Sequence, residues 1–356
     1  MKNKILHIVL ESSYNGATVY AYRLCSKLKE YDQEIVACFK GNAYDEIHLT
    51  IDCENLINTS EVSYKYLLLK YWRFIKFIRK KNYNIIHYHQ GGFGILLLAY
   101  FFRKKAAVIH HFHSGNLIGD NTRQNISIVH LKILKYLSNK TKQIAVAQHV
   151  FNEYYKKNGS AKNLKLIKNS TPFVFEKKQT RSNKIGFIGR FTKEKGFSSL
   201  SDISIKLKEK LPDIKILIMG DEPELYRKLL GESSTNIKLI DPELNTKKFF
   251  RGIDILLFLS TAKEGMPLVV LEAISFDISV IAYPLPALKE SLGNDYPLFV
   301  NNANDVVNII SSYYNGEIDL NKLSLVHKNI CIRHNEFEML ESINEIYINI
   351  KNETYS

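Results

Sequence analysis

Residues 253–273, IDILLFLSTAKEGMPLVVLEA, contain the pattern that decides the fold of this chain. An apolar run of strand length, residues 253–259, leads through a polar segment into a second apolar stretch. Gly265 permits a tight turn between the two, and Pro267 stands where a helix begins, because the first helical turn does not use that backbone N–H. The stretch therefore predicts a strand, a turn and a helix, the unit from which parallel α/β sheets are built.

The same alternation runs along most of the 356 residues. A chain of this length usually forms two domains, and strands separated by helical patterns indicate parallel sheets. We therefore expect an α/β protein with two Rossmann-like, doubly wound domains facing a cleft. The predicted strands cover residues 4–10, 34–37, 85–88, 107–111, 144–147, 165–167, 184–188, 215–219, 236–239, 253–259 and 280–282.

The domain boundaries follow from a break in this pattern. Residues 171–183 are rich in Pro, Lys, Gln, Thr, Arg and Ser, which is typical of a linker. We expect an N-terminal domain over residues 1–172, a linker over 173–183, a second domain over 184–335 and a C-terminal helix over 336–356. Apolar residues in that helix recur close to every 3.6 positions, so it either caps the second domain or crosses back onto the first.

Composition excludes several classes of protein. Hydrophobic residues make up 45% of the chain and charged residues 24%, as in ordinary soluble proteins. No apolar run approaches the roughly 18 residues that cross a bilayer, and residues 4–10 predict a first strand rather than a secretion signal. The four cysteines show no paired spacing, so neither a disulfide framework nor a zinc site is indicated. These features favour a cytoplasmic protein.

The positive charge is concentrated in one half of the chain. The net charge is +13, yet residues 1–172 alone carry 26 Lys and Arg against 11 Asp and Glu. A basic first half predicts an anionic partner there, either a membrane surface, a nucleic acid or a phosphorylated substrate.

The turn within residues 253–273 also carries chemistry. The free N–H groups at the start of its helix would face a ligand beyond the strand, which suits an anion such as phosphate. Glu264 precedes that helix and Glu272 lies about 1.5 turns into it. Carboxylates bind sugar and ribose hydroxyls through charge-assisted hydrogen bonds. The alternative is an ordinary strand–turn–helix with two solvated glutamates.

A second motif is GFIGRFTKEKG, residues 186–196. The pattern predicts a strand followed by a turn that holds Arg190 and Lys195. A guanidinium offers a planar fork to phosphate oxygens, and a lysine offers a mobile point charge. Two such cations could neutralise a departing diphosphate, although a solvated basic turn would show the same residues.

Taken together, the two motifs resemble the retaining glycosyltransferases of family 4, which have the GT-B architecture. That family carries a glycine-arginine turn with a lysine five residues later, followed by a glutamate-x7-glutamate pair. The resemblance extends over nearly the whole chain, including the GAT segment of residues 16–18 and the HFHS segment of residues 111–114. It implies the catalytic residues Arg190, Lys195, Glu264 and His113, the donor-binding residues Glu272, Gly265, Met266, Pro267, Leu268, Gly189 and Gly16, and the acceptor-side residues Asn15, Ala17 and Thr18.

The resemblance implies transfer of a hexosyl or N-acetylhexosaminyl unit from a nucleoside-diphosphate sugar to a glycan acceptor, with retention of configuration at the anomeric carbon. The donor is expected to be a UDP-sugar. The acceptor is expected on a lipid carrier, as in capsule, O-antigen or other surface-polysaccharide biosynthesis. A nucleotide-sugar epimerase or a sugar-phosphate glycosyltransferase of the same architecture is the alternative. The missing Gly-x-Gly-x-x-Gly disfavours a dinucleotide oxidoreductase, and the absence of a basic aromatic strip disfavours a nucleic-acid partner.

Five histidines occur near the ends of two predicted strands. They are His87, His89, His110, His111 and His113. No acidic residue accompanies them at metal-ligand spacing, and the chain contains no Asp-x-Asp, so we expect a metal-independent enzyme without a cofactor. Packing roles are expected for these side chains, with His113 the exception that the resemblance implies.

Residues 64–81 predict a basic amphipathic helix. Lys65, Arg73, Lys76, Arg79 and Lys80 share one face, with Leu69 and Trp72 at its edges. Such a helix can lie on anionic lipid, which predicts a peripheral protein at the inner face of the plasma membrane. The alternative is a surface helix that packs its apolar face on the first sheet, and the two interpretations are compatible.

Overall fold

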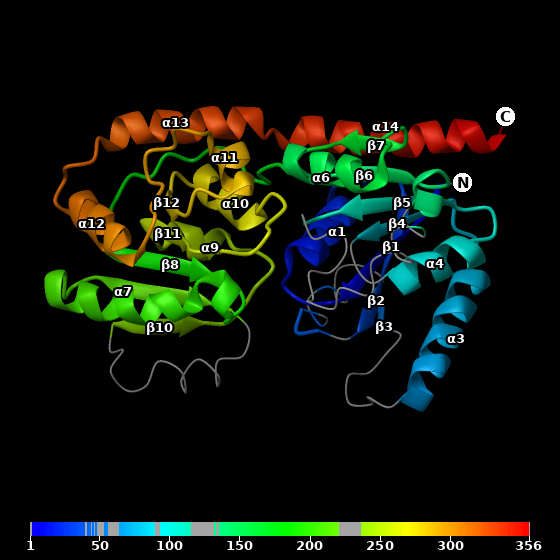
Figure 1. The fold of residues 1–356 in the computed structure, drawn as a ribbon, viewed down its shortest axis with the longest axis horizontal. Coiled ribbons are helices and arrows are strands. Elements are labelled where there is room, and N and C mark those ends of the chain that lie inside the picture. The colour runs from blue at the N-terminus through cyan, green and yellow to red at the C-terminus, as the bar shows by residue number, and fades with distance from the viewer. Residues whose placement is uncertain are drawn as a thin grey trace. The chain divides into compact units, whose positions relative to one another are not determined.

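The computed structural model describes residues 2–39, 41–43, 45, 47, 53–55, 64–89, 93–114, 132, 135–220 and 236–355 (Figure 1). The chain divides into two compact units. The first comprises Met1–Lys168 together with Phe337–Ser356, and the second comprises Asn169–Glu336. Each unit is built around its own parallel sheet. The predicted pair of α/β Rossmann-like domains is therefore confirmed.

The sheet of the first unit has seven strands in the order β3-β2-β1-β4-β5-β6-β7, and every pairing in it is parallel. The central strands are buried on both faces, and their residues are mostly apolar and β-branched with several buried histidines among them. The strands are β1 Lys4–Glu11, β2 Asp32–Phe39, β3 Cys53–Asn55, β4 Ile85–His89, β5 Ala107–Phe112, β6 Lys142–Ala145 and β7 Leu164–Leu166.

Helices cover both faces of this sheet. On one face α3 Tyr64–Lys80 and α4 Phe93–Phe102 bury Phe74, Phe77 and Leu96 against strand residues such as Ile8 and Tyr88. On the other face lie Tyr20 of α1 Gly16–Lys27 and Tyr347 of α14 Glu336–Tyr355, both in ring contact with strand histidines. The described part of this unit also contains α6 Gln148–Asn158.

The sheet of the second unit has five parallel strands in the order β10-β9-β8-β11-β12. They are β8 Lys184–Ile188, β9 Lys215–Met219, β10 Ile237–Ile240, β11 Ile255–Phe258 and β12 Ser279–Ala282. Among the surrounding helices, α7 Phe197–Lys210 packs with α12 Ala303–Tyr314, and α10 Leu268–Ser275 packs with α13 Leu320–Arg333. The remaining described elements are the short 3-10 helix Lys193–Lys195, α9 Lys247–Arg251 and α11 Pro286–Leu292.

Residues 173–183 and the C-terminal helix each belong to one of the two units. Residues 173–183, the expected linker, lie within the second unit, where Glu176 N–H donates to Ser275 O at 2.7 Å and the Glu176 carboxylate pairs with Arg251 at 2.7 Å. From Phe337 onward, α14 belongs to the first unit. Strand β3 was not predicted, because three residues are too few to show a periodic pattern.

Where its side chains are described, helix α3 packs its apolar face against the sheet and exposes its other face, as a surface helix does. Phe74, Phe77 and Ile78 are buried, whereas Trp72 is 59% exposed. The side chains of residues 64–71, including Lys65 and Leu69, lie outside the described residues. Over the described part of the chain, no helix combines the length and the apolar character needed to span a bilayer.

Candidate functional site

The turn between β11 and α10 places Glu264 at the carboxyl edge of the second sheet. The Glu264 carboxylate accepts a hydrogen bond from the hydroxyl of Ser260, two residues beyond the end of β11. Pro267 caps α10 with an extended backbone, so the helix begins one residue later than the sequence suggested, at Leu268. Gly265 and Met266 are buried beneath this turn.

Lys195 reaches Glu264 from the neighbouring loop. The Nζ atom of Lys195 lies 2.6 Å from Oε1 of Glu264, and both side chains are mostly buried. The loop is held in place by Thr261 N–H, which donates to Glu194 O at 2.7 Å. Because β8 and β11 are adjacent and parallel, their carboxyl ends deliver the two loops to the same point.

Gly196 makes this approach possible. Its φ of 81° lies in the left-handed region, and a Cβ added there would lie 2.3 Å from the carbonyl oxygen of Leu259. Only glycine permits both the backbone conformation and the contact with the end of β11. Gly189, at the end of β8, has a φ of 154° and is half-buried.

Arg190 occupies the same loop, and within the described part of the chain no hydrogen bond or ion pair joins it to the Lys195–Glu264 pair. Its side chain is exposed, and among the described residues its guanidinium makes no hydrogen bond or ion pair. The nearby Glu194 has a lowered pKa, because its own backbone N–H and the Thr192 hydroxyl donate to it and Arg190 adds positive charge. The guanidinium is therefore available to an anion arriving from solvent.

Glu272 lies on α10 and is 5% exposed. The hydroxyl of Thr246, which precedes α9, donates to Glu272 Oε2 at 2.9 Å. The sequence did not indicate Thr246 as a partner, because the two residues come from separate segments. Ser260 was equally missed, although its position at the end of an apolar strand is a weak signal for a site residue.

The side chain of Asn169 holds the backbone of the turn that precedes α10. Its side-chain amide donates to the carbonyl oxygen of Met266 at 2.7 Å, and its own carbonyl oxygen contacts Nδ1 of the buried His334 at 2.9 Å. Asn169 is 3% exposed and its Oδ1 has no partner among the described residues. A segment that follows β7 thus positions the backbone at the start of α10.

In the first unit, the predicted acceptor-side residues lie at the start of α1, directly after β1. Asn15 caps the helix by accepting from Thr18 N–H at 3.0 Å, and the Thr18 hydroxyl donates to Glu11 O at 2.6 Å. Asn15 and Gly16 are exposed, Ala17 is half-buried and Thr18 is buried. A Cβ added to Gly16 would meet open space.

His113 follows β5 at the same carboxyl edge of the first sheet. It is half-buried, contacts the ring of Tyr20 at 5.0 Å between centroids, and its Nε2 lies 3.1 Å from Nδ1 of His89. Burial lowers the pKa of His113 to about 3, so its ring is neutral at pH 7. Within the part of the chain that the structure describes, two sets of three histidines could hold a metal ion, His7, His87 and His89 and also His89, His111 and His113. In each set the ring nitrogens lie within 4.8 Å of one another.

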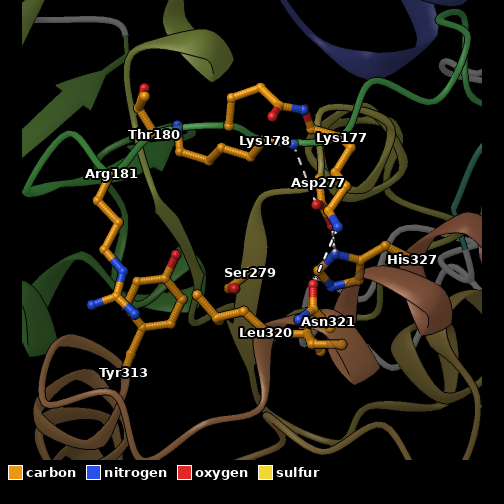
Figure 2. Close-up of a pocket in the computed structure, with 12 residues that line it drawn as sticks. Lys177, Lys178, Thr180, Arg181, Asp277, Ser279, Tyr313, Leu320, Asn321 and His327 are labelled. Carbon is orange, nitrogen blue, oxygen red and sulfur yellow. Dashed lines mark hydrogen bonds and ion pairs between the residues drawn. The ribbon is translucent and has the colours of Figure 1, made fainter.

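A separate cavity of about 250 Å³ lies at the opposite, amino edge of the second sheet (Figure 2). Figure 2 shows Asp277 beside His327, with Asp277 Oδ1 2.8 Å from His327 Nδ1. The cations around the cavity have partners, since Lys177 donates to Asn321 Oδ1 and Lys178 lies 3.4 Å from the buried Asp254. These contacts join residues 177–182 to the sheet and its helices, which is a structural role.

Two family models match the chain. Residues 14–171 match the model described as Glycosyltransferase Family 4, and residues 170–324 match the model described as Glycosyl transferases group 1. The amylovoran biosynthesis glycosyltransferase AmsD of Erwinia amylovora is 25% identical over 79% of this chain and 80% of its own length.

An uncharacterised glycosyltransferase of Methanocaldococcus jannaschii is 26% identical over 78% of this chain. The match covers 64% of that relative, so the chain spans less than two thirds of its length. Among solved structures, HepE of Anabaena in complex with UDP and glucose superposes with a TM-score of 0.75 at 17% identity, over 98% of this chain and 100% of HepE. That likeness concerns the fold.

Proposed function

Because the chain is built from a glycosyltransferase family 4 domain followed by a glycosyl transferases group 1 domain, we propose that it transfers a sugar from a nucleoside diphosphate to a glycan acceptor. The observation that carries the proposal is the Lys195–Glu264 pair beside the first turn of α10. Cations and helix N–H groups suit a diphosphate, and carboxylates suit hydroxyl groups.

In this proposal Arg190 and Lys195 stabilise the negative charge that develops on the departing diphosphate, with Gly189 leaving room for it. Glu264 binds sugar hydroxyls beside the backbone of residues 265–268, and Glu272 binds the ribose. His113 and Gly16 contact the donor, and Asn15, Ala17 and Thr18 face the acceptor. Interactions of this kind accelerate a reaction when they are strongest in the transition state.

The anomeric configuration is retained in the proposed reaction. None of the proposed site residues is placed as an enzymic nucleophile, so the acceptor hydroxyl attacks from the face that the diphosphate leaves. Its proton passes to the leaving phosphate oxygen. Arg190, Lys195 and the helix N-terminus supply the positive charge, so no metal ion or other cofactor takes part.

UDP-linked hexoses or N-acetylhexosamines are the proposed donors. HepE, whose fold is similar, was solved with UDP and glucose, which supports UDP-hexoses as the first donors to test. The proposed acceptor is a lipid-linked glycan of a capsule, O-antigen or other surface polysaccharide. The relative AmsD, named for amylovoran biosynthesis, supports such a product. The basic first domain supports work at the inner, cytoplasmic face of the plasma membrane.

The test is an assay with UDP-glucose, UDP-galactose and UDP-N-acetylglucosamine, with and without lipid-linked glycans extracted from the producing cells. We expect sugar transfer that depends on the acceptor and persists in EDTA, with the product linkage showing retention by NMR. Conversion of the nucleotide sugar without acceptor would identify an epimerase instead. The absence of any reaction, combined with no thermal stabilisation by UDP, would contradict the proposal.

A further inference from the structure

Histidines line one face of the first sheet across three adjacent strands. In the strand register His7 of β1 lies opposite His87 of β4, and His89 of β4 lies opposite His111 of β5. His113, two residues beyond His111, continues the same face because side chains alternate along a strand. His7, His87, His89 and His111 are fully buried, and His113 is half-buried.

Three of these histidines form a hydrogen-bonded chain that ends at Gln33 of β2. Nε2 of His7 lies 2.9 Å from Oε1 of Gln33, and Nδ1 of His7 lies 2.9 Å from Nε2 of His89. Nδ1 of His89 then lies 3.1 Å from Nε2 of His113. The hydrogen-bonded chain runs from the half-buried Gln33, near the start of β2, to His113 at the carboxyl edge of the sheet.

The side-chain amide of Gln33 sets the direction of these bonds. Its NH2 group donates to Leu28 O at 2.7 Å and to Cys25 O at 3.4 Å. Turning the amide over would place its oxygen against those two carbonyl oxygens, which are also acceptors. Oε1 therefore faces His7, and Nε2 of His7 must be the protonated nitrogen that donates to it.

Each ring passes this direction to the next because each carries a single proton. Burial lowers the pKa of His7 to about 4 and that of His113 to about 3, and burial together with neighbouring histidines holds the pKa of His89 well below its usual value. A neutral imidazole has one N–H and one lone pair. With its proton on Nε2, His7 accepts at Nδ1 from His89, and His89 accepts at Nδ1 from His113.

We propose that Gln33, His7 and His89 are positioning residues that hold His113 with its proton on Nε2, so that its Nδ1 accepts a hydrogen bond from a hydroxyl of the bound sugar. Among the described residues, nothing else contacts that Nδ1 through a hydrogen bond. The hydrogen bond from the sugar hydroxyl to His113 rests on the proposed function. A bare lone pair accepts from a hydroxyl but repels a carboxylate, so the site selects a neutral hexose over a hexuronate at this position.

A metal ion held by His89, His111 and His113 is the competing explanation for the same cluster. The chain of hydrogen bonds disfavours it, because Nδ1 of His89 and Nε2 of His113 already pair with each other. The histidine groups that could hold an ion contain no carboxylate among the described residues, so a buried divalent charge would lack compensation.

Long-range 1H–15N NMR of the full-length protein, labelled at histidine, tests the hydrogen-bonded chain. The signals of His113 are assigned as those that disappear in His113→Gln. We expect His7, His89 and His113 all to carry their proton on Nε2. In Gln33→Met, which is close in shape but offers no acceptor, His7 Nε2–H would lose its partner. Buried N–H groups are seldom left unpaired, so the chain should reverse and the tautomer ratio of His113 should shift about tenfold.

A further variant sharpens the test. Gln143→Met changes a buried glutamine of the same sheet that takes no part in the hydrogen-bonded chain, and it should leave the wild-type tautomers unchanged. A proton on Nδ1 of His113 in the wild type overturns the proposal, as does an unchanged His113 in Gln33→Met. A stoichiometric cobalt(II) absorption band that His111→Gln removes and His110→Gln keeps would show a metal site instead. The wild-type spectrum decides even if Gln33→Met fails to fold.

Kinetics test the choice of sugar. In Gln33→Met we expect kcat/KM for the UDP-hexose to fall about tenfold while that for the corresponding UDP-hexuronate holds or rises, because a protonated Nδ1 can donate to a carboxylate. Gln143→Met should keep the wild-type ratio. Equal losses for both donors would overturn the selection. If neither donor is turned over by the wild type, the proposed function fails, while the NMR result still decides the tautomer chain.

Discussion

Lys195 and Glu264 neutralise each other across 69 positions of sequence, although each is proposed to bind a different part of the donor. Their 2.6 Å contact gives both side chains a defined position at the carboxyl edge of the second sheet. A diphosphate that arrives beside Lys195 would share its ammonium with Glu264. Binding would therefore reorganise an existing ion pair rather than order two free side chains, which lowers the entropic cost of forming the site.

Removing either cation should slow the reaction without unfolding the protein. We expect Lys195→Ala and Arg190→Ala each to reduce kcat by about 10²–10³-fold, because each acts on charge that grows in the transition state. Thermal melting should change little for Arg190→Ala, whose side chain is exposed. Steady-state kinetics and a melting curve measure both effects. Near-normal turnover in both variants would remove these residues from the proposed mechanism.

The two glutamates should separate by role. Glu272→Gln should weaken binding of UDP, because this carboxylate is proposed to bind the ribose. Glu264→Gln should leave UDP affinity within a few-fold of the wild type and should mainly reduce transfer of the sugar. Isothermal titration calorimetry with UDP alone distinguishes them, and equal losses of UDP affinity would contradict the division of roles.

At the scale of elements, the end of β11 and the loop before α7 are fitted to each other through Gly196. Its positive φ and the 2.3 Å approach of Leu259 O to its Cβ position leave no room for a side chain. The same contact delivers Lys195 to Glu264. A change at Gly196 should therefore disturb both the stability of the second unit and the geometry of its site.

Gly196→Ala should destabilise the protein by about 2–3 kcal/mol, from backbone strain and the close contact together. Gly316→Ala provides a matched control, because Gly316 has a φ of 80° but nothing within 4 Å of its Cβ position. The free energy of unfolding in urea should fall clearly further for Gly196→Ala. Equal losses in the two variants would show that backbone conformation, and not the contact with Leu259, limits this position.

Helix α3 offers charge on its outer side while it packs on the sheet. Arg73, Lys76, Arg79 and Lys80 are exposed, whereas Lys81 pairs with the buried Glu34 at 2.6 Å. Lys76 also lies over the ring of the exposed Trp72, 5.2 Å from its centroid. A test of membrane binding should therefore change Arg73, Lys76, Arg79 and Lys80 and leave Lys81 in place. Loss of Lys81 would remove the cation that pairs with the buried Glu34 carboxylate.

We expect the protein to sediment with vesicles that contain anionic lipid and not with neutral vesicles. Each basic residue near the surface contributes about 1 kcal/mol, and salt should weaken binding because it screens these charges. Replacing Arg73, Lys76, Arg79 and Lys80 with glutamine should reduce sedimentation strongly. The same change at Lys208, Lys210, Lys215 and Lys238, which are exposed on the second unit, should not. Equal effects of the two sets would contradict docking through α3.

At the scale of the whole molecule, the two ends of the chain complete one unit. Tyr20 of α1 donates to Met339 Sδ of α14 at 3.0 Å, and the Tyr347 hydroxyl lies 2.6 Å from Nδ1 of His87. The buried histidines are thus enclosed by helices from both ends of the sequence. Their low pKa values couple the stability of the first unit to pH.

Stability should fall as the solution becomes acidic. Because burial lowers the pKa of His7 to about 4 and those of His110 and His113 to about 3, the unfolded chain binds more protons than the folded protein below pH 6.5. The free energy of unfolding therefore has its full value above about pH 6.5. It falls progressively as the pH drops towards 4, because the unfolded chain takes up protons that the buried histidines do not. Urea unfolding at pH 7 and pH 5 should show a lower free energy at pH 5, with uptake of more than one proton on unfolding. Equal stability at both values would contradict the neutral cluster.

Much of the fold of this protein could be predicted from its sequence alone. The order of strands along the chain, the strand–turn–helix at residues 253–273 and the α/β class depend on local patterns, and local patterns are visible in sequence. Residues 186–196 and 263–273 identified the loops that meet at the second sheet, because chemistry at the carboxyl ends of parallel strands needs particular residue types there. The roles of Arg190, Lys195, Glu264 and Glu272 stay predictions.

Tertiary structure alone decided which distant residues meet. The pairing of Ser260 and Lys195 with Glu264, the support of Met266 by Asn169, and the chain from Gln33 to His113 depend on strand order and register. The same holds for α14, whose apolar period showed that it must pack but not against which domain. A periodic pattern specifies the buried face of an element, whereas its partner is set by the packing of the whole chain.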